Sequence, residues 1–272
     1  MYCLIPGLLA ACATDRDVIP LEQSHMNAPV RVLVLESPMS VGPGRLGAVF
    51  APDTKPGSQA VAGPIVRGEA HAREFALVTM DSALGKLSKV ELVKSPAQAS
   101  KPFRDAERKN FESPVTQHEA DELAVATGAD ALLRFRITDY GLTPRSWRKG
   151  YITFEVASTL AIAGLVAYSG TTAAKAAAGA YLAQETIEET AEAYAGFGAL
   201  NVVWRPVRVE AELERLNPAA TVWKGSETGL SEAKLSRLVR KVPSAERDSQ
   251  LDQATSHAVD DLVSDLSVAM GD

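Results

Sequence analysis

The segment that most restricts the fold is the ten-residue run ALLRFRITDY, at residues 131–140. Apolar and polar side chains alternate along it, as they do in a strand with one buried face. They are Leu133, Phe135 and Ile137 on one side and Arg134, Arg136 and Thr138 on the other. Alternation of this kind is typical of a sheet that packs on one face and meets water on the other. It therefore predicts a sheet with helices on one side only, and it places Arg134 and Arg136 on the solvent-exposed side.

Hydrophobic periodicity predicts the remaining elements. Expected strands cover residues 30–35, 89–93, 207–213 and 221–226, and expected helices cover 68–87, 117–127, 152–168, 172–195 and 249–270. The two late strands form a hairpin around the turn Asn217-Pro218-Ala219-Ala220. Residues 38–63 and 95–114 are expected to be loops. The helix at 117–127 has the clearest ends, because Thr116 and Glu119 can form a capping box and Gly128 can end it.

The order of these elements predicts an α+β fold, that is, an α/β two-layer arrangement. It contains a mixed sheet with helices mainly on one face, plus an inserted α-helical hairpin. The chain of 272 residues suits one large domain or two small ones. Its net charge of −6 argues against a nucleic-acid partner, since such proteins usually carry a basic excess.

The first residues, MYCLIPGLLAACATD, carry a possible lipidation motif. Residues 1–11 are apolar and uncharged, like a secretory signal peptide. Leu9-Ala10-Ala11-Cys12 is similar to a bacterial lipobox, in which the cysteine thiol is acylated and the peptide is cut just before it. Cys12 is therefore the expected lipidation site, and residues 12–29 the expected lipidated tether. The alternative is an apolar terminus with a chance cysteine. Ala13 rather than aspartate follows Cys12, which favours the outer membrane.

The segment at 150–199 interrupts the α/β pattern. Residues 156–174 carry no charge, and they are rich in Ala, Gly, Ser and Thr. A membrane span is one interpretation of this stretch. A soluble helical hairpin is the favoured one, because small residues gain little from lipid and a single crossing would separate strands of one sheet. Four small residues are predicted to permit close helix contact within the domain or with another subunit: Ala157, Ala161, Gly164 and Ala167.

No catalytic motif is recognisable. The only cysteines are Cys3 and Cys12, and the four histidines are scattered: His25, His71, His118 and His257. A pair of strand-end carboxylates, Asp130 and Asp139, could act as acid and base, but turn or cap roles are the favoured interpretation. The glutamates between 185 and 192 indicate a solvated face rather than a metal site, and Trp147, Trp204 and Trp223 indicate packing rather than a groove. We therefore expect no catalytic residue, cofactor or metal.

The element order resembles the small α/β domain shared by the amino-terminal domain of TolB, the curli-export lipoprotein and peptidoglycan-synthase activator lipoproteins. The matching segments are VRVLVLE, FALVTMDSALGKLSKVELV, HEADELAVATGADALLRFRITDYG, VRVEAELERLNPAATVWKGS and the closing helix. The resemblance covers residues 30–149 and 200–272, with 150–199 as a helical insertion. It carries over no catalytic residue.

The resemblance implies a binding, scaffold or accessory role in a bacterial envelope assembly. The expected protein is an outer-membrane-anchored periplasmic lipoprotein that contacts the membrane through its lipid anchor and has an envelope protein as partner. A homo-oligomer is possible. Two alternatives remain open: a subunit of an oligomeric export channel, and a cell-wall-acting enzyme with an unrecognised site.

Overall fold

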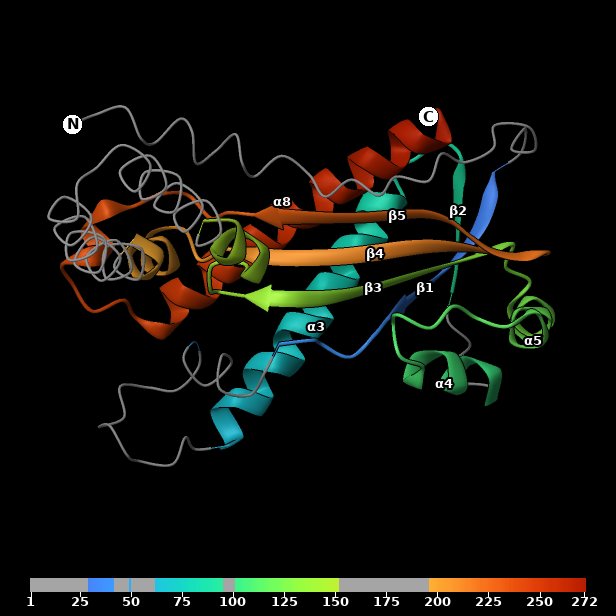
Figure 1. Cartoon of the computed structure of the whole chain (residues 1–272), viewed down its shortest axis with the longest axis horizontal. Coiled ribbons are helices and arrows are strands. Elements are labelled where there is room, and N and C mark those ends of the chain that lie inside the picture. The colour runs from blue at the N-terminus through green and yellow to red at the C-terminus, as the bar shows by residue number, and fades with distance from the viewer. Residues whose placement is uncertain (1–28, 42–48, 50–61, 95–100, 152–195) are drawn as a thin grey trace, which may run out of the picture.

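The computed structural model describes residues 29–41, 49, 62–94, 101–151 and 196–272. Within these residues five strands form one mixed sheet in the order β2-β1-β3-β4-β5 (Figure 1). The strands are β1 (Val30–Glu36), β2 (Val90–Val93), β3 (Ala131–Tyr140), β4 (Val207–Leu216) and β5 (Ala219–Gly229). Strand β1 runs parallel to β2 and β3, whereas β3, β4 and β5 are antiparallel in succession. The expected α+β class with a mixed sheet is confirmed.

Two long helices, α3 and α8, lie along one face of the sheet (Figure 1). The helices are α3 (Ala62–Leu84), α4 (Lys101–Arg108), α5 (Gln117–Thr127), the short 3₁₀ helix η1 (Leu235–Leu238) and α8 (Ser244–Met270). Helical turns also occur at 145–151 and 196–203. Polar contacts hold α3 and its C-terminal turn to α8: His71 Nε2 lies 2.9 Å from Asp252 Oδ1, and Lys89 Nζ donates to the Met270 carbonyl at 2.9 Å.

The main core lies between the sheet and these two helices. The alternating residues of β3 point into it as predicted, and Leu133, Phe135 and Ile137 are all fully buried. The predicted stripe of α8 faces them: Leu251, Ala254, Ala258, Leu262 and Leu266 are buried. Trp223 of β5 belongs to the same core, which confirms its packing role.

The opposite face of the sheet is only partly exposed to solvent. Helices α4 and α5 cover one end of it and enclose a second apolar cluster with Leu33, Leu132 and Leu216. Helices therefore lie mainly on one face, as expected, but not on one side only. Helix α4 falls in a segment expected to be a loop, residues 95–114. It has only eight residues, of which Phe103 and Ala106 are the buried apolar ones, so its stability depends on packing rather than on a periodic pattern.

Several element ends differ from the predicted ones. Helix α8 begins at Ser244, five residues early, because its first turn is polar and shows no apolar stripe. Helix α3 begins inside the expected loop 38–63 and ends at Leu84, just before a Gly85 turn. The hairpin strands β4 and β5 are longer than predicted because their ladder extends past the alternating residues. Helix α5 has the predicted capping box and ends at Gly128. The expected helices at 152–168 and 172–195 lie outside the described residues.

Candidate functional site

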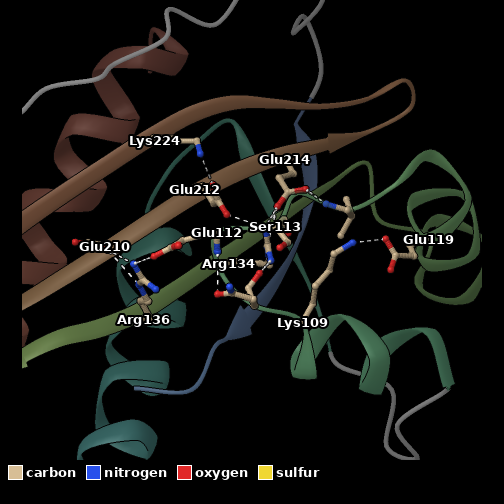
Figure 2. Close-up of polar contacts among 12 residues, drawn as sticks. Lys109, Glu112, Ser113, Glu119, Arg134, Arg136, Glu210, Glu212, Glu214 and Lys224 are labelled. Atoms are coloured by element: carbon tan, nitrogen blue, oxygen red, sulfur yellow. Dashed lines mark hydrogen bonds and ion pairs between the residues drawn. The ribbon is translucent and has the colours of Figure 1, made fainter. Parts of the chain in front are cut away.

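The most unusual group of side chains is a buried ionic cluster on the second face of the sheet, centred on Arg134 (Figure 2). The guanidinium donates from Nε to Glu214 Oε1 and from Nη2 to Glu212 Oε1, each at 2.7 Å. The side chains of Arg134, Glu212 and Glu214 are exposed by 0%, 3% and 1% respectively. The expectation that Arg134 faces water is therefore wrong, although it does lie on the predicted side of the strand.

Strand register brings these charges together. Strands β3 and β4 are antiparallel, and their register places Arg134 opposite Glu212 and Arg136 opposite Glu210. Alternate residues of each strand share a face, so Glu214 lies on this face too. Directly opposed side chains of unlike charge stabilise a strand pair. The ion pairs thus stabilise this register of the two strands.

The segment at 109–116, which we call the cover segment, lies over the cluster. Arg134 donates to the carbonyl groups of Asn110, at 3.3 Å, and Ser113, at 3.0 Å. The backbone N–H of Val115 donates to Glu214 Oε2 at 2.8 Å. The buried arginine and glutamate are therefore bonded to backbone groups that would otherwise need water. This explains why Arg134 is buried, since the cover segment excludes water from it.

The cluster continues outwards towards solvent. Arg136 pairs with Glu210 at 2.9 Å, and its Cζ lies 4.5 Å from the centre of the Phe111 ring. Lys224, on β5, pairs with Glu212 Oε2 at 2.9 Å and is 47% exposed on its side chain. Arg136 also lies 3.4 Å from Glu112, and Arg208 lies 3.6 Å from Glu210, so the cluster contains four cations and four anions.

The arrangement fits a fastening role rather than a reaction centre. Each carboxylate oxygen of Glu212 and Glu214 has a partner within the protein. An acid or base in catalysis must reach a substrate atom within hydrogen-bond distance. These carboxylates are directed into the cluster instead, so the cluster holds the cover segment against the sheet.

Lys109 and Glu119 tie the start of the cover segment to helix α5. Glu119 Oε2 accepts from the Thr116 backbone N–H at 2.7 Å and also from Lys109 Nζ. Burial raises the pKa of Glu119, but the hydrogen bonds from Lys109 and Thr116 outweigh it and lower that pKa to about 2. The carboxylate is therefore favoured in the folded protein.

We expect Glu119→Gln to lower the free energy of unfolding by about 1 kcal/mol at pH 7. The effect is modest because the Glu119 side chain is 36% exposed and water screens its charge. The folded pKa lies below the ordinary value of 4.5, so the contribution is complete above pH 4.5 and is lost as the pH falls towards 2. Urea unfolding at pH 7, 4 and 3 should show the difference in free energy of unfolding between the wild type and Glu119→Gln becoming smaller as the pH falls. Glu122→Gln, on the same helix, is the control, and a pH-independent difference would contradict this account.

Among the residues that the structure describes, none of the sequence-predicted site residues are brought together. Cys12 and the proposed interface residues Ala157, Ala161, Gly164 and Ala167 lie outside the described residues, as do His25 and the glutamates between 185 and 192.

The histidines on helices have separate local contacts: His71 with Asp252, His118 with Glu122, and His257 with the Leu230 carbonyl. In the described part of the chain no three His, Cys, Asp or Glu residues are placed to hold a metal ion.

The strand-end carboxylates are also far apart. Asp130 precedes β3 and accepts from the Arg31 backbone N–H at 3.0 Å, whereas Asp139 is buried near the other end of the strand. Nine residues of extended strand separate two positions by roughly 30 Å. The two aspartates cannot act on one substrate atom, and the Asp130 side chain binds the backbone of the neighbouring strand β1.

The described residues thus define an α+β domain with a mixed sheet, and the cover segment encloses the ionic cluster on its second face. None of the helices in those residues is both long and apolar enough to cross a membrane. The sequence matches no protein-family model, and no curated protein matches it. One structurally similar chain is the hypothetical protein CT253 from Chlamydia trachomatis, solved at 1.65 Å resolution. It is 9% identical, with a TM-score of 0.40, over 88% of this chain and 98% of that chain. That score is too low to relate the two folds.

Proposed function

We propose that this chain is a lipoprotein anchored to the periplasmic face of a bacterial outer membrane by acyl chains on Cys12. The observation that carries the proposal is the run Leu9-Ala10-Ala11-Cys12 after an apolar, uncharged segment. Residues 1–11 are the signal peptide that is removed, and residues 12–29 are the tether. The first strand of the sheet, β1, begins at Val30, directly after this tether.

The domain beyond the tether acts as a binding or scaffold component of an envelope assembly. Two features support this role over catalysis. The buried ionic cluster uses its charges to fasten the protein's own backbone, and the histidines of the described helices contact separate local partners. The element order, similar to that of the TolB amino-terminal domain, also supports a protein partner in the envelope.

Cys12→Ser is expected to abolish incorporation of labelled palmitate and to release the protein from the membrane fraction. A serine hydroxyl does not replace the thiolate as the nucleophile that takes the acyl-bearing group. The measurement is metabolic labelling in a diderm bacterium, followed by separation of inner and outer membranes.

Cys3→Ser is the matched control, because it makes the same change at the chain's other cysteine, within the segment that the peptidase removes. It should leave labelling and fractionation unchanged. The proposal fails if Cys12→Ser protein still incorporates palmitate, or if Cys3→Ser abolishes incorporation.

A further inference from the structure

A short loop after β5 exposes several large apolar side chains. In the described residues six large hydrophobic side chains are exposed, and three of them fall within five consecutive positions. They are Leu235, Leu238 and Val239, exposed by 70%, 49% and 88% respectively. Scattered single exposed hydrophobics are ordinary, but a contiguous group indicates a contact surface. We call residues 234–241 the basic-apolar loop.

Its geometry holds these side chains outwards. Helix η1 is a 3₁₀ helix with about three residues per turn, so Leu235 and Leu238 lie on one side of it. Arg237 occupies the inner side and is only 4% exposed. It donates to the Val203 carbonyl at 2.9 Å, to the Glu232 carbonyl at 2.6 Å, and from Nε to Glu246 at 3.0 Å. Because the arginine is fixed against the body of the domain, the apolar side chains cannot turn inwards.

The same loop is strongly basic. Residues 234–241, KLSRLVRK, contain four cations and no acid, in a chain whose net charge is −6. Lys234, Arg240 and Lys241 are exposed. Glu232 lies 3.2 Å from Lys234 Nζ, and Glu246 binds Arg237 and Arg240. Residues 234–241 themselves carry a formal charge of +4, which these glutamates offset in part.

We propose that the basic-apolar loop docks on the surface of an anionic lipid bilayer. Its leucine and valine side chains enter the boundary between headgroups and acyl chains, and its cations contact the lipid phosphates. Apolar side chains flanked by Lys and Arg are the general features of interfacial membrane contact. A second copy of the chain fits less well, since a twofold interface would place the same cations against each other.

The inference rests on the proposed function in one respect, namely that a lipid anchor keeps the domain beside a membrane. The loop adds an orientation of the domain relative to the membrane that a lipid-anchored tether alone does not provide. With the loop on the bilayer, the end of the domain that carries η1 and the start of α8 faces the lipid. The opposite end, with α4 and α5, is then directed away from it (Figure 1).

The test uses the full, unacylated chain with Cys3→Ser and Cys12→Ser, so that the anchor makes no contribution. In this background Ser236→Cys, at an exposed position of η1, carries an environment-sensitive fluorophore. We expect brighter, blue-shifted emission on vesicles of equal parts phosphatidylglycerol and phosphatidylethanolamine, and no change on phosphatidylcholine vesicles. Raising the salt concentration should weaken the response, since it screens exposed cations.

Leu235→Ser together with Val239→Ser should weaken binding to the anionic vesicles by about tenfold or more, because two large apolar side chains are no longer transferred from water into the lipid interface. The matched control is Val125→Ser, which alters an equally exposed valine on α5 and should change nothing.

The proposal would be overturned if the fluorescence response were equal on both vesicle types. It would also be overturned if the double variant bound anionic vesicles as tightly as the labelled protein that keeps Leu235 and Val239. A dimer in sedimentation that the double variant converts to a monomer would overturn it too, because a second copy would then cover the loop. Labelling at Cys12 is read separately, so either proposal can fail alone.

Discussion

Replacing Arg134 by methionine is expected to lower the free energy of unfolding by about 3–5 kcal/mol. The substitution leaves Glu212 and Glu214 buried, with side-chain exposures of 3% and 1%, and without the guanidinium that both carboxylates contact. It also removes the donors to the Asn110 and Ser113 carbonyls, so the cover segment loses its attachment. Urea unfolding monitored by circular dichroism measures the change.

Arg136→Met is the matched control for this prediction. Arg136 makes the same kind of pair two register positions along, with Glu210, but its side chain is 14% exposed and Glu210 is 27% exposed. Its loss should cost about 1 kcal/mol, because water can solvate the remaining carboxylate. Replacing Arg134, Glu212 and Glu214 together by apolar residues of similar size should recover the part of the loss that is due to unpaired buried carboxylates. It should not recover the part that is due to the backbone groups of the cover segment. Equal losses for Arg134→Met and Arg136→Met would contradict the assigned burial.

Gly229→Ala should lower the free energy of unfolding by about 3 kcal/mol, through a clash rather than a lost contact. A Cβ at this position would lie 2.0 Å from the Ala254 carbonyl oxygen and 2.4 Å from the Ala258 backbone nitrogen. Both atoms belong to the backbone of α8, so no side-chain rotation relieves the overlap. Helix α8 would have to move away from β5, and the core between them would open. Thermal and urea unfolding measure the loss.

Gly198→Ala makes the same change where no atom lies within 4 Å of the added carbon. Residue 198 is in a helical segment, where alanine is favoured over glycine by about 0.5–1 kcal/mol, so stability should stay the same or rise slightly. If Gly229→Ala were as well tolerated as Gly198→Ala, the close packing of α8 on β5 would be wrong.

Much of the fold could be predicted from the sequence where its signal is local. Alternation along β3 gave its bounds and its buried face, and the capping residues of α5 gave both ends of that helix. Each signal depends on residues only a few positions apart. Helix α4 had no such signal, because eight residues, five of them charged and two of them buried apolar, form a helix only when α5 and the sheet pack against it.

The sequence also contains a pattern that indicates the ionic cluster. Glu210, Glu212 and Glu214 alternate along β4 with the same period as Arg134 and Arg136 along β3. Opposite charge on two alternating strands indicates that they are neighbours in the sheet. The pairing partner could therefore have been predicted, but burial could not, since the cover segment that excludes water lies about 20 residues before Arg134 in the chain.

The sequence by itself determined which face of each strand a side chain occupies, because the two-residue period of a strand is a local property. It also determined the lipidation motif on which the proposed function rests. Only the tertiary structure decided that Arg134 is enclosed while Leu235 and Val239 remain in water. The physical reason is that burial depends on which distant segments lie over a residue. The cover segment lies over Arg134, whereas Arg237 takes the inner position of η1 and keeps its apolar neighbours outside.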